Sequence, residues 1–156
     1  MPSQVEVSFL AADQVQSVIP LFEAQFREHE VPSSSETIAL QLQELLAQPE
    51  SGFVLCATGH GTPVGLAYGA SIVSLEHGGR SGWLEEFYVS PEWRGQGVGS
   101  ALLAAFVATG KERGWRAIDL EVDAAHERTL PLYARHGFGP VLRKRFVRRL
   151  REPAED

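Results

Sequence analysis

The sequence predicts a mixed α/β fold of the α+β type, in which four helices cover a mostly antiparallel sheet of six to seven strands. Three observations lead to this prediction. The apolar spacing changes several times between helical and strand periodicity, three strand-like segments follow one another across short glycine turns, and a glycine-rich turn joins a strand to an apolar helix. The 156 residues are expected to form one domain, 1–156, because a chain of this length can bury a core without disulfides or metals.

A strand and two helices are expected in the N-terminal third. The strand is Val5–Leu10, where apolar and polar side chains alternate. In Ala11–Glu30 the apolar residues fall at helical spacing, and Pro20 should either kink this helix or mark its true start. The second helix is expected to begin at a capping box formed by Ser33 and Glu36, and to end before the next proline.

The central part of the chain has strand character. Gly52–Thr58 and Pro63–Val73 are expected to pair as a hairpin across the Gly-His-Gly turn at 59–61. After a second turn at 77–79, Gly82–Val89 should form a third consecutive strand. Antiparallel pairing of all three is the economical arrangement.

The C-terminal half begins with an apolar helix after the glycine-rich turn. Arg116–Val122 is the next strand, and the helical crossover that leads to it makes it parallel to the strand before the turn. A short helix is expected at Leu130–His136 with Gly137 as its C-cap, and one or two strands should run from Phe138 to Leu150. The predicted order is therefore β-α-α-β-β-β-α-β-α-β, with a further β if the last segment folds back on itself.

Charge is unevenly distributed along the chain. The net charge is −6, and the first fifty residues hold eight acidic residues and one arginine, whereas Arg143–Arg151 holds six of the fourteen basic residues. Solvated faces account for both segments, although the acidic third would also attract a cationic partner. Nucleic acid is not expected as a partner, because the chain as a whole is acidic.

The cellular setting is expected to be the cytoplasm, without a membrane partner. No apolar run approaches the roughly 20 residues of a membrane-spanning helix, and the N-terminus does not resemble a signal peptide. The single cysteine, Cys56, lies among apolar residues and is expected to be a buried, inert thiol.

The turn "RGQGVGS", Arg94–Ser100, is typical of an anion site, because glycines let the backbone approach a ligand and a helix N-terminus supplies free amides. Two known phosphate-binding patterns fail here. A dinucleotide fingerprint counted from Gly95 has Ser100 in place of its last glycine, and the Gly-Lys-Ser/Thr ending of a Walker A loop is absent. What remains is an arginine followed by glycines at Gly97 and Gly99.

Two segments of the chain resemble the GNAT superfamily of N-acetyltransferases. "LEEFYVSPEWRGQGVGSALL" is similar to the acetyl-CoA-binding segment of that superfamily, with its Arg/Gln-x-x-Gly-x-Gly/Ala signature, and "RTLPLYARHGF" resembles its second segment. The element order also matches over nearly the whole chain. The strand "LEEFYV" is similar to that of the diamine and polyamine acetyltransferase branch.

The resemblance implies an acetyl-CoA site around the turn. Backbone amides would bind the CoA pyrophosphate, with Arg94 at the edge of the site and with free backbone groups at Phe87 and Val89 holding the pantetheine arm as an added strand. The amide near Val89 would also act as an oxyanion donor. The amides at the turn belong to Gly95, Gln96, Gly97, Val98, Gly99 and Ser100.

The resemblance also implies the catalytic groups. Tyr133 would be the general acid that protonates the leaving thiolate, and Glu85 would be the base, with Glu86 as the second candidate. Strand alternation should send these two acids to opposite faces of the sheet. The plainer alternatives are that Tyr133 only packs a short helix on the core, and that both acids are surface charges.

The chain departs from the superfamily pattern at two positions before and within the second segment. His126 stands where many relatives have asparagine, so that it is a candidate CoA contact, and Pro131 requires the short helix to begin near Thr129. The histidines show no spacing typical of a metal site, and no metal is expected.

The expected function is transfer of an acetyl group from acetyl-CoA, as co-substrate, to the primary amine of a small cationic acceptor in a ternary complex. The alternatives are an aminoglycoside, an amino acid or a protein N-terminus as acceptor, a non-catalytic acyl-CoA sensor, and a nucleotide-binding module. A homodimer is expected because dimers are common in the superfamily that the chain resembles.

Overall fold

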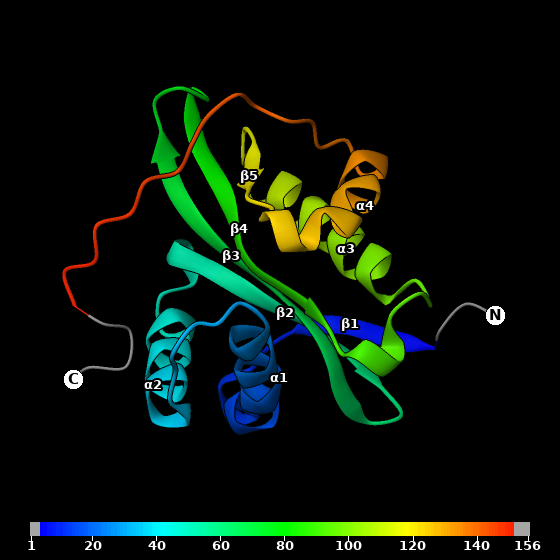
Figure 1. Ribbon diagram of the computed structural model, residues 1–156. Helices are drawn as coiled ribbons and strands as arrows, with labels where there is room; N and C mark the ends of the chain where they lie inside the picture. Colours follow the sequence, from blue (N-terminus) through cyan, green and yellow to red (C-terminus); the bar gives the residue numbers. More distant parts are fainter. Residues whose placement is uncertain (1–3, 152–156) are drawn as a thin grey trace.

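The fold is a five-stranded mixed sheet with helices on both faces, as shown by a computed structural model that describes residues 4–151. Figure 1 shows α1 (Val15–Glu28) and α2 (Ser35–Leu46) against one face, and α3 (Val98–Glu112) and α4 (Leu130–Arg135) on the other. Within residues 4–151, no helix combines the length and the apolar character that crossing a bilayer requires.

The strands follow one another in the sheet in chain order. β1 (Val5–Phe9), β2 (Gly52–Gly59), β3 (Thr62–Ser74) and β4 (Gly79–Val89) are antiparallel neighbours, and β5 (Ile118–Leu120) pairs with β4 in parallel. These directions confirm the hairpin and the crossover predicted from the sequence.

The structure settles where two helices begin. Pro20 is the sixth residue of α1 and neither begins nor ends it. Its side chain is exposed, so that water can hydrate the carbonyl left without an amide donor. The cap of α2 is Ser34 rather than Ser33, and its hydroxyl accepts a hydrogen bond from the Thr37 amide at 3.1 Å.

Each face of the sheet buries its own apolar core. Against α1 and α2 the core includes Val18, Phe22 and Leu66, and against α3 and α4 it includes Phe53 and Phe106. The α3 side is closely packed, because a Cβ atom on Gly69 would lie 2.5 Å from the Phe106 ring. Cys56 is buried and not disulfide-bonded, as predicted.

A β-bulge interrupts β4 at Glu85. Tyr68 of β3 pairs with Glu86, and the next residue, Gly69, pairs with Leu84, which leaves Glu85 as the extra residue of β4. Leu84 and Phe87 therefore both contact the core on the α3 side, although they are three positions apart. The expected alternation that would send Glu85 and Glu86 to opposite faces fails here, because the bulge shifts the alternation by one residue.

The C-terminal strands predicted at Phe138–Leu150 do not form, and the sheet has five strands among the described residues rather than six or seven. Figure 1 shows this segment running past β5 and the β3–β4 turn as an irregular chain. β5 offers only three paired residues, and apolar side chains in the segment are exposed, so that no buried face fixes a strand register. The segment is held instead by Arg143, which pairs with Glu76 at 2.8 Å, and by Arg145, which pairs with Glu121 at 2.7 Å.

Candidate functional site

The glycine-rich turn leads into the N-terminus of α3. Gly95 and Gly97 have φ angles of +74° and +85°, which favour glycine, and Gly97 is the N-cap of the helix. A Cβ atom at either glycine would meet no described atom within 4 Å. The helical hydrogen bonds begin with the Ala101 amide, which donates to the Gly97 carbonyl at 3.0 Å. The preceding amides are therefore free to bind an anion.

Arg94 fixes the turn to the rest of the molecule. Its Nε atom donates a hydrogen bond to the Val89 carbonyl at 2.9 Å, and its guanidinium pairs with Glu28 at 2.8 Å. The same guanidinium lies over the Tyr88 ring, 5.4 Å from the ring centre. Arg94 therefore connects the turn to β4 and to the C-terminal end of α1. The Gln96 side chain donates to the Glu92 carbonyl at 2.9 Å, which adds a second side-chain contact within the turn.

The C-terminal part of β4 has an open edge. β4 pairs with β5 only over Gly82–Leu84, so that the two strands separate where the bulge begins. The Ser90 amide donates to the Val64 carbonyl at 2.8 Å, on the β3 side. Because backbone groups alternate in direction along a strand, those of Phe87 and Val89 face the open edge. This edge can accept an extended ligand as an added strand, although the Val89 carbonyl is already bonded to Arg94.

Tyr133 of α4 lies beside this open edge. It is 9% exposed, and its ring centre is 6.0 Å from those of Phe87 and Phe138. Burial raises the pKa of Tyr133 to about 12, so that its hydroxyl keeps its proton at neutral pH. The Ser100 hydroxyl and His136 Nε2 are 2.9 Å apart and join the start of α3 to the end of α4.

A pocket of about 370 Å³ opens on the other face of the sheet, between α1, α2 and the strands. Its wall is mainly apolar but includes Glu86, whose pKa is raised to about 7 by burial and by the neighbouring Glu85, against a hydrogen bond with Gln25 that lowers it. Burial also raises the pKa of the pocket residue Tyr68. The full lining is Phe22, Phe26, Ile38, Gln41, Leu42, Glu44, Leu45, Gln48, Ser51, Tyr68 and Glu86.

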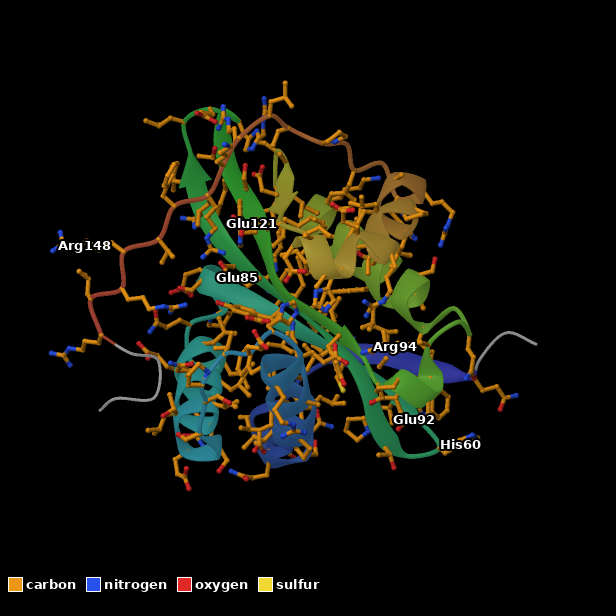
Figure 2. All side chains as sticks on the ribbon, viewed as in Figure 1. His60, Glu85, Glu92, Arg94, Glu121 and Arg148 are labelled. Carbon is orange, nitrogen blue, oxygen red and sulfur yellow. The ribbon has the colours of Figure 1, made fainter. Side chains whose placement is uncertain are left out.

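Glu85, the first candidate for the base, does not line this pocket. It is exposed and lies on the same side of the molecule as Glu121, as Figure 2 shows. Arg145 and Glu86 are also among the charged groups that act on it or that it acts on. Burial raises the pKa of Glu85, while Arg145 lowers it and Glu121 raises it. Of the two adjacent acids, Glu86 is therefore the one with a substrate-sized space beside it.

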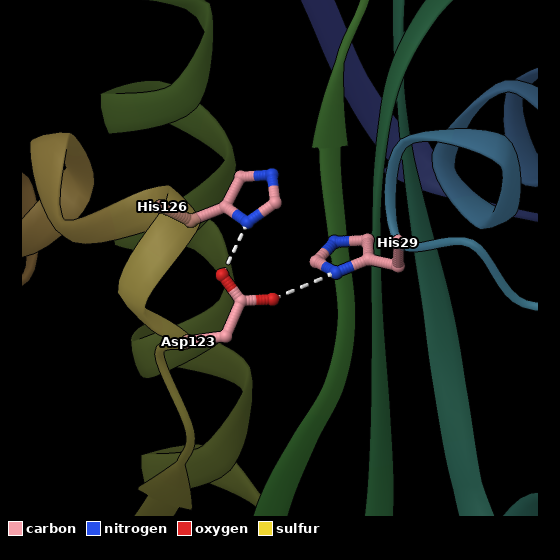
Figure 3. A group of neighbouring side chains, drawn as sticks. All are labelled: His29, Asp123 and His126. Carbon is pink, nitrogen blue, oxygen red and sulfur yellow. Dashed lines mark hydrogen bonds and ion pairs between the residues drawn. The ribbon is translucent and has the colours of Figure 1, made fainter.

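His126 belongs to a cluster that the sequence analysis did not detect. Its Nδ1 atom is 2.5 Å from one carboxylate oxygen of Asp123, and His29 Nδ1 is 3.1 Å from the other (Figure 3). A hydrogen bond with His126 lowers the pKa of Asp123, and His29 adds to this effect. His29 lies 94 positions before Asp123 in the chain, so that no local spacing reveals the cluster.

The fold and the glycine-rich turn together define an α/β protein with an anion site at a helix N-terminus, and comparison with known proteins gives the family. Residues 16–138 match the acetyltransferase (GNAT) family, and the chain belongs to this family. Over 144 residues it is 30% identical to a mycothiol acetyltransferase of Propionibacterium freudenreichii subsp. shermanii, covering 90% of the chain and 45% of that protein.

One further relative and one solved structure of the same fold have aminoglycoside acetyltransferase names. An aminoglycoside N(6')-acetyltransferase type 1 of Stenotrophomonas maltophilia is 37% identical over 100 residues, covering 55% of the chain and 63% of that protein. An aminoglycoside N-acetyltransferase solved in complex with CoA has a TM-score of 0.81 at 19% identity, over 96% of the chain and 97% of that structure. The chain thus matches less than two thirds of the length of either curated relative.

Proposed function

We propose that the protein is an N-acetyltransferase that transfers an acetyl group from acetyl-CoA to the primary amine of a small cationic acceptor, in a ternary complex. One observation carries the proposal. The same strand, β4, has an open edge beside the glycine-rich turn and Tyr133, and it also presents Glu86, with a pKa of about 7, to a pocket of about 370 Å³. Strand β4 thus joins a site for the acyl donor to a site for the acceptor.

The turn and the strand edge suit acetyl-CoA. The free amides at the start of α3 would bind its pyrophosphate, and the open space above Gly95 and Gly97 would admit it. The backbone of Phe87 and Val89 would hold the pantetheine arm along the open edge. Arg94 would act by holding the turn in place, and His126 is our candidate for a further contact with the cofactor.

The chain supplies the groups that acyl transfer requires. Bound acetyl-CoA contributes an acetyl group activated as a thioester. Glu86 accepts a proton from the acceptor ammonium, so that the free amine can attack the thioester carbon. The Val89 amide donates a hydrogen bond to the carbonyl oxygen as that oxygen becomes negative. Tyr133 would donate its hydroxyl proton to the sulfur as the carbon–sulfur bond breaks. The attacking nitrogen then loses its second proton, which restores the Tyr133 hydroxyl, and the products are the amide and free CoA.

A cationic acceptor fits the pocket. Glu44 and Glu86 are its acidic groups, and the apolar wall formed by residues such as Phe22 and Leu42 would contact the carbon skeleton. The similarity of "LEEFYV" to the diamine and polyamine branch supports a polyamine-like amine, whereas the relatives are named for mycothiol and for aminoglycosides. An amino acid and a protein N-terminus are the remaining alternatives.

The deciding experiment is CoA release from acetyl-CoA with a panel of polyamines, aminoglycosides, amino acids and short peptides. A melting-temperature shift with acetyl-CoA is the parallel measurement. Release with one class of amine would establish the activity and identify the acceptor. A clear thermal shift without release from any acceptor would favour a non-catalytic acyl-CoA sensor, and the absence of both would remove the proposal.

A further inference from the structure

The three residues His29, Asp123 and His126 bring three metal-ligating side chains to one place. His29 follows α1, whereas Asp123 and His126 lie in the connection between β5 and α4. One ligand atom from each residue lies within 4.8 Å of those of the other two. Figure 3 shows both imidazoles next to the Asp123 carboxylate, with one of its oxygens directed to each.

We propose that His29, Asp123 and His126 bind one divalent transition-metal ion of the zinc class. Two imidazole nitrogens and one carboxylate are a ligand set typical of zinc with an open fourth position. Tetrahedral zinc has ligand bonds of about 2.0–2.2 Å, which places neighbouring ligand atoms about 3.4 Å apart. The present distances from the Asp123 oxygens to the two Nδ1 atoms, 2.5 and 3.1 Å, are those of hydrogen bonds, so that an ion would replace these hydrogen bonds and the ligand atoms would move apart by up to about 1 Å.

Local packing supports the histidines in this arrangement. The two imidazole rings are stacked, with centres 4.4 Å apart and planes inclined by 26°. His126 is the better buried of the two, at 17% side-chain exposure, and the Thr129 hydroxyl donates to its carbonyl at 2.6 Å. Asp123, at 51% exposure, leaves a path for an ion to enter and for water to complete the coordination.

An ion at this position would connect two segments that lie on opposite faces of the sheet. Asp123 lies just after β5 ends at Leu120, where β4 and β5 have already separated, and His29 reaches it from the other face of the sheet. The residue before His29 is Glu28, which pairs with Arg94 of the glycine-rich turn. A bound ion would therefore link the end of α1 to the β5–α4 connection, beside the open edge of β4.

The test is titration of the untagged protein with Zn²⁺ by calorimetry, together with the visible absorption of Co²⁺ as a reporter of coordination by nitrogen. We expect one ion per chain. His29→Ala and His126→Ala should each weaken Zn²⁺ binding at least tenfold, in line with the losses of about 10–100-fold that follow removal even of groups that only orient ligands. They should also weaken the Co²⁺ bands.

His77→Ala is the matched control. His77 Nε2 is 2.8 Å from the Asp119 carboxylate, but among residues 4–151 no second histidine joins this pair within metal-binding distance. This variant should bind Zn²⁺ as the unchanged protein does. The proposal is overturned if the unchanged protein binds no Zn²⁺, or if the double variant of His29 and His126 binds it equally well. Circular dichroism spectra and melting temperatures of each variant would show whether weaker Zn²⁺ binding comes from unfolding or from the loss of the ligand side chain.

Discussion

The pKa of a single residue, Glu86, determines how we expect the catalytic activity to change with pH. Its pKa of about 7 means that the base form appears only as the pH rises through neutrality. We expect kcat/KM to increase across this range and then to level off, because Tyr133 with a pKa of about 12 keeps its proton. Glu86→Gln should remove the rise and reduce kcat by about a hundredfold or more.

The neighbouring acid provides the control for this experiment. Glu85→Gln removes the same kind of charge one position away, at an exposed bulge residue that does not line the pocket. It should retain most of the activity in assays of CoA release. The assignment of the base would be reversed if Glu85→Gln were the inactive variant and Glu86→Gln turned over normally.

Glu86 should also make stability depend on pH. Its pKa rises from an ordinary value of 4.5 to about 7 on folding, so the folded protein holds this proton more tightly than the unfolded chain. Its contribution to the free energy of unfolding is complete below the unfolded pKa and is lost as the pH rises through about 7, by about 3 kcal/mol at most. Urea unfolding at about pH 5 and about pH 8 should show Glu86→Gln gaining stability relative to the unchanged protein at the higher pH. An equal difference at both pH values would contradict the shifted pKa.

Tyr133→Phe should separate chemistry from packing. The phenyl ring retains the contacts with Phe87 and Phe138, so that the free energy of unfolding should change by less than about 1 kcal/mol. Loss of the hydroxyl should lower kcat by about a hundredfold, with little change in the KM for acetyl-CoA. Steady-state kinetics at neutral pH would test this, and near-normal turnover would exclude Tyr133 as the general acid.

At the scale of an element, we predict that the glycine-rich turn determines the affinity for acetyl-CoA. Gly97→Ala would add a Cβ atom in front of the free amides of α3, at a φ of +85° that costs a residue with a side chain about 1–2 kcal/mol. Calorimetric titration should show at least a tenfold loss of affinity for acetyl-CoA. Gly114→Ala is the matched control, because Gly114 has a φ of +76° and equally open space but follows the other end of α3. Equal losses of affinity in both variants would show that backbone strain weakens binding, and not the Cβ atom in front of the free amides.

Local signals predicted most of the elements, and the exceptions have identifiable causes. The turn at His60 and Gly61, both with positive φ, was evident because two strand-like segments flank it. The bulge at Glu85 was not, because an extra residue in one strand is defined only by its partner, here Tyr68 and Gly69. The N-cap residue of α2, Ser34, has an extended backbone. The neighbouring Ser33 could adopt the same conformation, so the sequence alone does not decide which serine caps the helix.

The assembly state is a prediction at the scale of the whole molecule. We propose a homodimer whose interface includes the C-terminal segment from Val141, because its large apolar side chains are exposed in one chain; they are Val141, Leu142, Phe146, Val147 and Leu150. Sedimentation velocity should show a dimer for the full chain and a monomer for a chain ending at Pro140. A monomeric full chain would exclude the dimer, and a dimeric shortened chain would place the interface elsewhere.

The parts of the site that come from distant segments could not be predicted from the sequence. The turn and Tyr133 could be chosen as candidates because each lies in a short recognisable segment. The pocket beside Glu86 needs α1, α2 and two strands to be assembled, and burial in that assembly is what raises the pKa of Glu86. The meeting of His29 with His126 likewise depends on how α1 docks on the sheet, which no single segment encodes.

The extra residue at Glu85 lies between two residues whose partners on β3 are consecutive, because Glu86 pairs with Tyr68 and Leu84 pairs with Gly69. Deleting Glu85 alone would therefore restore regular alternation without changing the register, and Glu86 would keep the face on which it lines the pocket. The chain can thus gain or lose one residue at this point while its pairing with β3 keeps the carboxylate in place, which makes β4 tolerant of a change in length just beside the acid that the pocket needs.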